Sequence, residues 1–272
     1  LLVRETQRAV RLYGWTKLRR AAHRDLGGDV LPGGDRAALH ASLGRALAGM
    51  WMAYQPIVSV TERKVVAYEA LMRTSEPSLP FPGAILRAAE RLDRCEDVGR
   101  RVRELVSETL AASPDVDVFM NLHARDLLDE TLYASNTPLA SHARRVVLEI
   151  TERAAVDDIA DLKDRVARLR ELGFRIAIDD LGAGFAGLAS FAQLEPDIIK
   201  IDMSLTRDVH RMPIKQKLVG SIASVCRDLG IVMVVEGVET AEERNTVIEL
   251  GCSVLQGYLF ARPGKPFPGV EW

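Results

Sequence analysis

Polar and ionisable side chains that could bind a metal ion or a substrate recur in this sequence at the ends of short β-rich runs. Taken alone, a strand-end aspartate is usually a helix N-cap, and a strand-end glutamate is usually a surface charge. Their joint occurrence on successive runs instead predicts one shared site. The residues in these positions are Glu69, Asn121, Glu149, Asp179, Asp180, Lys200, Glu236 and Gln256.

The charge of such a cluster determines what must bind there. Its carboxylates cannot all be ionised at close range without a compensating cation. Carboxylates together with the amide oxygen of Asn121, and with no clustered His or Cys, favour Mg²⁺ or Mn²⁺ over zinc. The adjacent Asp179 and Asp180 favour two metal ions, which activate a water and screen a phosphate during in-line displacement. The pattern therefore predicts phosphodiester hydrolysis.

Lys200 and Glu236 are suited to the chemical step itself. We expect Lys200 to orient the attacking hydroxide or stabilise it electrostatically. Glu236 is expected to hold a second water or to accept its proton. The residue types leave the division between these roles open.

Eight runs typical of β-strands alternate with amphipathic helical segments beyond residue 50. This alternation predicts an α/β protein with a (β/α)8 TIM-like barrel, leaving room for one antiparallel strand. The C-terminal strand ends of such a barrel converge on one mouth. An open doubly wound sheet is the alternative, and strand number and length favour the barrel. The runs are MAYQPIVSV, KVVAYEAL, DVFMNL, RVVLEIT, FRIAID, DIIKID, IVMVVE and CSVLQGYLF.

Three helices are expected to end at a Leu-Gly pair before the next strand. The helix over 156–172 ends at Gly173 and the helix over 214–229 at Gly230. A third begins at a capping box formed by Thr240 and Glu243 and ends at Gly251. Helical spacing within 214–229 predicts a buried apolar stripe made of Ile214, Leu218, Ile222, Val225 and Leu229.

Composition and charge limit the cellular setting. A net charge of -2 over 272 residues creates no field that would hold a nucleic-acid duplex. Three scattered cysteines suit a reducing cytoplasm, and no apolar stretch approaches the roughly 20 residues of a membrane span. We therefore expect a soluble, cytoplasmic domain. Because the chain begins at Leu1, we expect a longer protein with an upstream sensor or regulatory domain, in which a membrane anchor could also lie.

The first 34 residues differ in composition from the rest. Residues 1–34 are rich in arginine and then in glycine, which predicts a linker or signalling helix followed by a hinge. The main domain then spans 35–272 and starts with a helix over 35–48 that Asp35 could cap. The basic segment could instead be a nucleic-acid arm, but a solvated helix that joins domains carries the same charge.

A series of motifs extends from about residue 36 to 265 in a fixed order. They are YQPIV at 54–58, EALMR at 69–73, NL at 121–122, LEITE at 148–152, IDDLGAGFAGL at 178–188, KID at 200–202, EGVET at 236–240 and QGYLF at 256–260. In these motifs the chain resembles the EAL domain family. The resemblance implies a cyclic-guanylate-specific phosphodiesterase that linearises cyclic di-GMP to pGpG and so lowers a bacterial second messenger.

The resemblance also implies a cofactor and a partner. Two Mg²⁺ or Mn²⁺ ions are expected, with Ca²⁺ inhibitory, and the domain is expected to form a homodimer. The residues that match the family's metal ligands are Glu69, Asn121, Glu149 and Asp179, with Asp180 at the second metal.

The remaining matched residues have other implied roles. By resemblance, Lys200 and Glu236 surround the nucleophilic water, and Glu152 anchors the loop after the fifth strand. A guanidinium such as that of Arg73 can grip a phosphate bidentately. The residues that match contacts to cyclic di-GMP are Gln55, Arg73 and Gln256.

One loop departs from the family pattern. The common form reads DDFGTGYSSL, and this chain differs from it at Leu181, Ala183, Phe185, Ala186 and Gly187. In the family this loop positions metal ligands and lies near the dimer interface, so the rate and its regulation depend on it. Because both aspartates and Glu152 are retained, an active enzyme is favoured. The alternative is a weak or inactive cyclic di-GMP receptor that signals to a partner.

A second pattern in the same loop suggests a different cofactor. Residues 182–187 satisfy G-x-G-x-x-G, and Asp202 follows 20 residues after Gly182, as in a dinucleotide fold. Asp179 and Asp180, however, directly precede the first glycine and would repel a pyrophosphate. An NAD site would also leave the other strand-end carboxylates unexplained.

Overall fold

The computed structural model describes residues 33–113, 115–151, 161–182 and 194–272. The chain forms two compact units, Leu1–Ala41 and Ser42–Trp272. Of the first unit, only the beginning of helix α2 (Gly33–Ala48) is described, so the expected basic helix lies outside the described residues. The expectation that Asp35 caps this helix is wrong, because Asp35 lies within its first turn, after Gly33 and Gly34.

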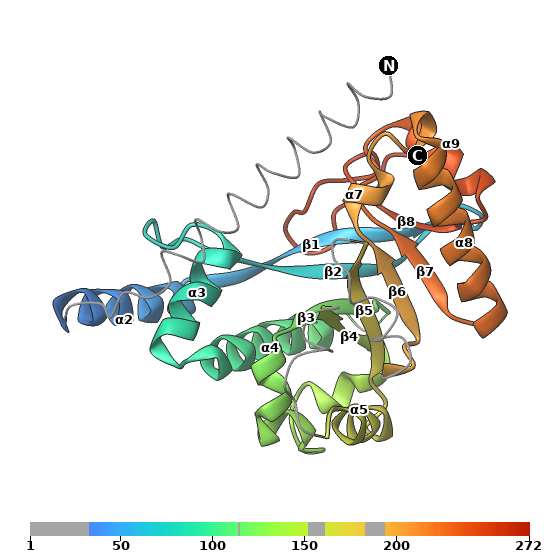
Figure 1. The fold of residues 1–272 in the computed structure, drawn as a ribbon. Helices are drawn as coiled ribbons and strands as arrows, with labels where there is room; N and C mark the ends of the chain where they lie inside the picture. Colours follow the sequence, from blue (N-terminus) through green and yellow to red (C-terminus); the bar gives the residue numbers. More distant parts are fainter. Residues whose placement is uncertain (1–32, 114, 152–160, 183–193) are drawn as a thin grey trace. The chain divides into compact units, whose positions relative to one another are not determined.

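The second unit is a closed barrel of eight strands in chain order. Strand β1 is antiparallel to both of its neighbours, and every other neighbouring pair is parallel. The TIM-like barrel is thus confirmed, including its one antiparallel strand, and the open doubly wound sheet is excluded (Figure 1). The strands are β1 (Met50–Ser59), β2 (Lys64–Thr74), β3 (Val118–Leu122), β4 (Val146–Thr151), β5 (Arg175–Leu181), β6 (Ile198–Ile201), β7 (Val232–Val235) and β8 (Val254–Gln256).

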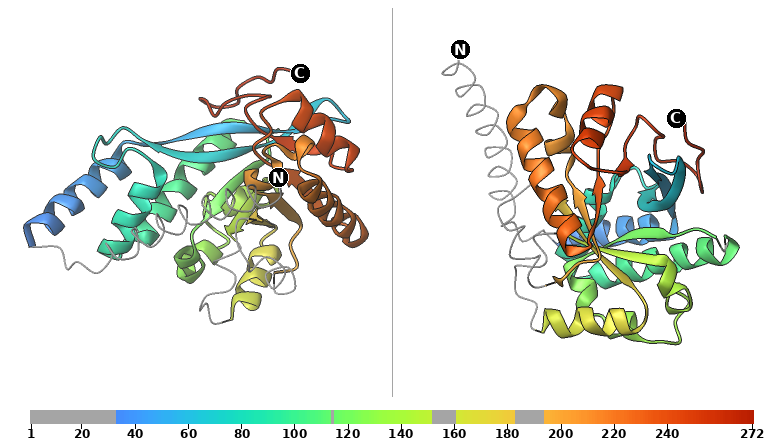
Figure 2. Two further views of the ribbon diagram at one scale, coloured as in Figure 1. Left: turned by 45° about the horizontal axis from the view of Figure 1, so that its top comes forward. Right: turned by 90° about the vertical axis from the view of Figure 1, so that its right-hand side faces the viewer.

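Helices lie outside the strands, as Figure 2 shows. None of those described is both long and apolar enough to cross a membrane. The α-helices in the described part of the barrel unit include α3 (Pro82–Leu92), α4 (Cys95–Ala112), α5 (Leu162–Glu171), α7 (Met203–Thr206), α8 (Pro213–Leu229) and α9 (Ala241–Glu249). Short 3₁₀ helices are η1 (Ala124–Leu128), η2 (Glu130–Tyr133), η3 (Ala140–Arg145) and η4 (Val209–Arg211).

The expected helix-to-strand joints are present after α5, α8 and α9. Gly173, Gly230 and Gly251 follow these helices with φ of 101°, 71° and 92°, in the left-handed region that glycine enters without strain. The capping box of Thr240 and Glu243 at the start of α9 is also formed. These local signals were sufficient to locate the ends of three crossover helices.

The expected burial of the apolar stripe on α8 is wrong. Ile214, Leu218 and Leu229 are 63%, 46% and 61% exposed, and Val225 is also exposed. The helix instead packs inward through the smaller residues Val219, Ala223 and Cys226, which are buried. Two apolar stripes run along this helix, and their spacing alone cannot tell which of them faces the barrel. One apolar face of α8 therefore remains exposed in this single chain.

The interior of the barrel is filled by one layer of inward-pointing apolar side chains. Each comes from a different strand, and Val254 of β8 packs against them. Because side chains alternate along a strand, the residue two positions nearer the C-terminal strand ends points into the barrel as well. The buried residues of this layer are Ile57, Ala67, Phe119, Val147, Ala177, Ile198 and Val234.

The C-terminal segment, residues 264–272, covers part of the outer face of β1 and β2. Gly264 exchanges two backbone hydrogen bonds with Tyr54, and the hydroxyl of Tyr68 donates to the carbonyl of Pro268 at 3.3 Å. The ring of Phe267 lies 5.2 Å from that of Tyr54 and 4.9 Å from that of Tyr68. Because a hairpin joins β1 to β2, this segment takes the covering place that a crossover helix has elsewhere.

Phe267→Ala is expected to lower the free energy of unfolding by about 1–2 kcal/mol, because Phe267 is half-buried and loses two aromatic contacts. Urea unfolding followed by circular dichroism measures the change. Lys265→Ala is the control, since Lys265 is exposed in the same segment and its loss should leave stability unchanged. Equal stabilities for wild type and Phe267→Ala would contradict a covering role.

Candidate active site

The residues expected to bind metal or substrate form a second layer directly above the apolar one. Each follows its strand's apolar residue by two positions, so it points into the barrel at the C-terminal mouth. In the antiparallel β1 the direction is reversed, and Gln55 precedes Ile57 by two positions. The other members of this layer are Glu69, Asn121, Glu149, Asp179, Lys200, Glu236 and Gln256.

Lys200 lies at the centre of this layer and is fully buried. Its Nζ is 2.5 Å from Oε1 of Glu149 and 2.5 Å from Oε1 of Glu236. It is also 3.4 Å from Oε2 of Glu69 and 3.4 Å from Oδ1 of Asp179. One ammonium group cannot by itself neutralise four carboxylates in a buried setting. The layer therefore needs further positive charge to balance its carboxylates.

The buried groups of the layer have strongly shifted pKa values. Burial raises the pKa of Glu149 well above its usual value, and the neighbouring Glu69 raises it further. Burial raises the pKa of Glu236 to about 8, although Lys200 opposes this shift. Burial alone would lower the pKa of Lys200, but the surrounding carboxylates outweigh it and raise that pKa well above normal. Lys200 is therefore charged at neutral pH.

Two side-chain amides hold Glu69 in place, and a third supports one of them. Nδ2 of Asn121 donates to Oε1 of Glu69 at 3.1 Å, and Nε2 of Gln256 donates to Oε2 at 2.7 Å. The same Nε2 lies 3.2 Å from Oε1 of Gln55, whose own Nε2 donates to the carbonyl of Ala261. Asn121 uses its nitrogen in this way, which leaves its amide oxygen as the atom to offer a cation.

Asp179 and Asp180 reach the same mouth although they are consecutive in β5. In a regular strand their side chains would point to opposite faces. The pairing of β5 with β6 is irregular between Ile178 and Leu181, and Asp180 has a φ of 60° in the left-handed region. As a result, Asp179, Asp180 and Glu236 can each place a carboxylate oxygen within 4.8 Å of the others.

These residues fit a divalent cation. Among the described residues, both carboxylate oxygens of Glu149 and Oδ1 of Asp179 are buried and find no aligned hydrogen-bond donor. The contacts of Lys200 with Oε1 of Glu149 and Oδ1 of Asp179 are ion pairs. A buried carboxylate without hydrogen bonds is costly unless a cation binds it. The donors are all oxygens, the set that Mg²⁺, Mn²⁺ and Ca²⁺ prefer. The grouping adds Glu236, which was expected to hold a second water or to accept its proton, to the candidate metal ligands.

Two cavities have Leu71 as a common lining residue. The first, of about 330 Å³, lies over the carboxylate layer and is also lined by Met203, Glu239 and Tyr258. The second, of about 610 Å³, is lined by residues of β2, α3 and α4 and by Asn121.

Besides Asp180, two of the expected site residues are not placed in this layer. Arg73 lies four residues after Glu69 on β2, and its guanidinium donates to the carbonyl of Met72 at 2.8 Å. Its contact with substrate stays a prediction. Glu152 lies outside the described residues, as do the substituted loop positions Ala183, Phe185, Ala186 and Gly187. Leu181 is described and is buried at the end of β5.

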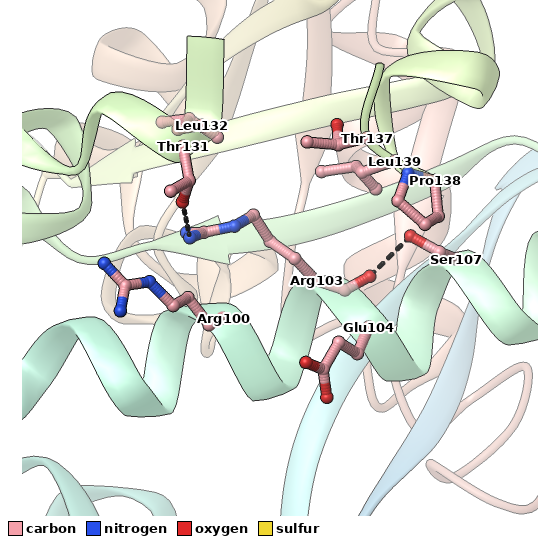
Figure 3. A pocket seen from close by; sticks show the side chains of 9 residues that line it. All are labelled: Arg100, Arg103, Glu104, Ser107, Thr131, Leu132, Thr137, Pro138 and Leu139. Atoms are coloured by element: carbon pink, nitrogen blue, oxygen red, sulfur yellow. Dashed lines mark hydrogen bonds between the residues drawn. The ribbon is translucent and has the colours of Figure 1, made fainter. Parts of the chain in front are cut away.

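A third cavity, of about 240 Å³, lies between α4 and the segment containing η2 and η3 (Figure 3). Arg103 points into this region, but its guanidinium is 2.5 Å from Asp129 and 3.4 Å from the hydroxyl of Thr131. Ser107 donates to the carbonyl of Arg103. The guanidinium of Arg103 is thus already bound within the protein, and the barrel mouth is the stronger candidate site.

The fold and the mouth together define the class of protein: a TIM-like barrel whose C-terminal mouth is acidic, surrounds a buried lysine and suits divalent cations. The chain belongs to the EAL domain family, since the model of the family, described as EAL domain, matches residues 38–263.

Curated and solved relatives agree with this membership. The chain is 32% identical over 223 residues to the cyclic di-GMP phosphodiesterase RocR of Pseudomonas aeruginosa, covering 77% of this chain and 56% of RocR.

Klebsiella pneumoniae BlrP1, in a calcium and cyclic di-GMP complex, superposes with a TM-score of 0.74 at 29% identity, covering 83% of this chain and 59% of that one. BlrP1 has also been solved with manganese and cyclic di-GMP. The PaMucR phosphodiesterase, in complex with c-di-GMP, superposes with a TM-score of 0.75 at 26% identity, covering 84% and 98%. The chain thus spans little more than half of RocR and BlrP1.

Proposed function

We propose that this chain hydrolyses cyclic di-GMP to linear pGpG with the help of two divalent metal ions. The observation that carries the proposal is the layer of four carboxylates around the buried Lys200, next to the Asp179, Asp180 and Glu236 grouping. The names of RocR and the PaMucR structure support the reaction, and the metal complexes of BlrP1 support the cofactor. Residues 35–272 are proposed as the catalytic domain.

The residues of the layer would divide the work as follows. The first ion would be held by Glu69, Asn121, Glu149 and Asp179, and the second by Asp180 with Glu236 near it. Bound divalent ions lower the pKa of water and screen phosphate charge. Lys200 holds the attacking oxygen in place through its ammonium group. Glu236, whose Oε1 lies 2.5 Å from Nζ of Lys200, would accept the proton of the water.

Substrate binding is proposed for the residues at the edge of the layer. Gln55 and Gln256 line the first cavity. Arg73 is proposed to grip a phosphate.

A chromatographic assay of cyclic di-GMP with Mg²⁺, Mn²⁺ and Ca²⁺ in parallel tests the function. We expect pGpG in Mg²⁺ and Mn²⁺ and strongly reduced product in Ca²⁺. Tight binding in Mn²⁺ with no pGpG over hours would identify a receptor rather than an enzyme. Formation of pGpG in EDTA would contradict the metal requirement.

A homodimer is proposed through the exposed apolar face of α8, formed by Ile214, Leu218, Val225 and Leu229. The four residues share one side of the helix, and a two-fold interface would let each copy cover the face of the other. Leu218→Glu is expected to convert a dimer into a monomer, as measured by light scattering after size-exclusion chromatography. Leu128→Glu is the matched control, because Leu128 is 51% exposed on η1. A dimer that survives Leu218→Glu would contradict this interface.

The proposed location is the cytoplasm. Cys95, Cys226 and Cys252 are all buried and unpaired, as suits a reducing compartment. Alkylation of intact cells before lysis, followed by mass spectrometry, would find these residues as free thiols.

A further inference from the structure

The loop that follows β7, residues 236–240, is bound to the segment that follows β6. The amide of Glu236 donates to the carbonyl of Ile201 at 3.1 Å. Two nitrogens of Arg207 then contact the two carboxylate oxygens of Glu239, at 2.5 and 2.6 Å. Arg207 follows α7, and α7 follows the strand that carries Lys200. The segments that carry Lys200 and Glu236 therefore contact each other twice. Within the site Lys200 pairs with Glu236, and outside it Arg207 pairs with Glu239.

The two segments are also packed against each other without free space. Gly237 has a φ of 67°, and a Cβ placed on it would lie 2.4 Å from Cβ of Met203 on α7. At the far end of the loop, the buried carboxylate of Glu243 accepts from the amides of Glu239 and Asp208. The loop is thus held at its start, at Glu239 and at Glu243.

Glu239 is the least protected of these attachment points. Its side chain is 35% exposed, and it lines the cavity over the carboxylate layer. Arg207 is its hydrogen-bonded partner, and this bond lowers the pKa of Glu239. Without Arg207, the carboxylate of Glu239 would be free to turn into a mouth that is already acidic. Half-exposed ion pairs contribute little to overall stability, so the loss acts on the loop rather than the fold.

We propose that Arg207 is a positioning residue: through its forked contact with Glu239 it holds the loop over residues 236–240, so that Glu236 stays beside Lys200. Arg207 itself touches neither of these residues. Its effect is on the geometry of Glu236, whose Oε1 lies 2.5 Å from Nζ of Lys200. The inference rests on the proposed hydrolysis of cyclic di-GMP and adds a residue that none of the sequence motifs singled out.

The test compares Arg207→Gln, Glu239→Gln and the double variant. Because either substitution breaks the same contact, each is expected to lower kcat about tenfold with KM changed less than about twofold. The double variant should be no slower than either single variant. Exchanging the two residues, Arg207→Glu with Glu239→Arg, should restore kcat to within about threefold of wild type.

Arg262→Gln is the matched control for charge. Arg262 stacks on Tyr258, 4.4 Å from the ring centroid, and acts on Glu239 only through its charge. If positive charge at the mouth were the important property, Arg262→Gln and Arg207→Gln would both raise KM and leave kcat unchanged, which would overturn the proposal. Independent, additive losses in kcat for Arg207 and Glu239 would overturn it too.

Hydrogen exchange of backbone amides tests the positioning role of Arg207 without relying on the proposed hydrolysis. Amides in residues 236–240 are expected to exchange at least about tenfold faster in Arg207→Gln than in wild type, and Arg262→Gln should not change them. If wild type makes no pGpG, the proposed function fails, while the exchange rates still test whether Arg207 holds the loop. Unchanged exchange rates in Arg207→Gln would overturn the positioning role.

Discussion

Glu69→Ala is expected to lower the turnover of cyclic di-GMP by at least about a thousandfold while the barrel stays folded. Both carboxylate oxygens of Glu69 are engaged, by the amides of Asn121 and Gln256. Oε2 also lies 3.4 Å from Nζ of Lys200. The substitution removes a proposed metal ligand and releases the amides that orient it, so the remaining ligands bind the metal weakly. Turnover is measured with saturating Mn²⁺.

Thermal unfolding distinguishes loss of metal from loss of fold. In EDTA, Glu69→Ala should be as stable as wild type or more so, because one of four mutually repelling carboxylates is gone. Mn²⁺ should raise the Tm of wild type and not that of the variant. Glu104→Ala is the control, since Glu104 is 61% exposed on α4 and pairs only with Arg101 among the described ion pairs. Normal turnover or an unchanged Mn²⁺ shift in Glu69→Ala would mean that the metal binds elsewhere.

Lys200→Met is expected to have the second large effect, on both rate and stability. Methionine keeps the length of the side chain and removes its charge, leaving four buried or half-buried carboxylates without their ammonium partner. We expect kcat to fall about a hundredfold or more, with a much smaller change in KM, because Lys200 acts on the attacking oxygen. In EDTA the free energy of unfolding should fall by about 3–5 kcal/mol.

The matched control is Lys163→Met, because Lys163 is 74% exposed and its ion pair with Glu195 lies on the surface. It should change neither kcat nor stability by a measurable amount. A rise in KM with kcat unchanged in Lys200→Met would assign Lys200 to binding instead. A stable, fully active Lys200→Met would refute its place at the centre of the site.

The stability loss in Lys200→Met should also depend on pH. Burial raises the pKa of Glu236 from 4.5 to about 8, so the folded state holds this proton more tightly than the unfolded state. The resulting stabilisation is complete below about pH 4.5 and is lost as the pH rises through about 8. Above about pH 8 the ionised Glu236 is paired with Lys200 in wild type but has lost this partner in Lys200→Met. In EDTA, the difference in the free energy of unfolding between wild type and Lys200→Met is therefore expected to be larger at pH 9 than at pH 6. Urea unfolding at the two pH values measures it, and an equal difference would contradict the shifted pKa.

Much of the barrel could be predicted because its signals are local. All eight expected runs contain a strand, although β8 covers only Val254–Gln256 of the run over 252–260. The Leu-Gly joints end three of the helices where expected. Alternation along a strand depends only on the backbone, so a polar residue two positions after a core residue must point into the same interior. For this reason Glu69, Glu149 and Lys200 could be recognised as members of one layer before any contact was known.

Other features of the structure could not be predicted because they depend on which surfaces of distant segments pack together. Helical spacing identified the apolar stripe of Ile214, Leu218 and Leu229 but assigned it to the wrong side, because a neighbouring stripe of smaller residues packs closer to the barrel. The metal grouping of Asp180 with Asp179 required an irregular β5–β6 pairing that no composition signal marks. Glu239 is part of the EGVET motif, but its partner Arg207 lies 32 residues away in sequence. No local pattern in the sequence predicts that these two residues pair.

The sequence by itself determined the order of the strands, the ends of several helices and the identity of the residues at the barrel mouth. These follow from backbone conformation and side-chain alternation, which each segment carries alone. Only the tertiary structure decided that Lys200 lies among four carboxylates, that one face of α8 stays exposed and that Arg207 binds the loop carrying Glu236. Each of these depends on distances between segments far apart in the chain, and those distances are set by packing rather than by any single segment.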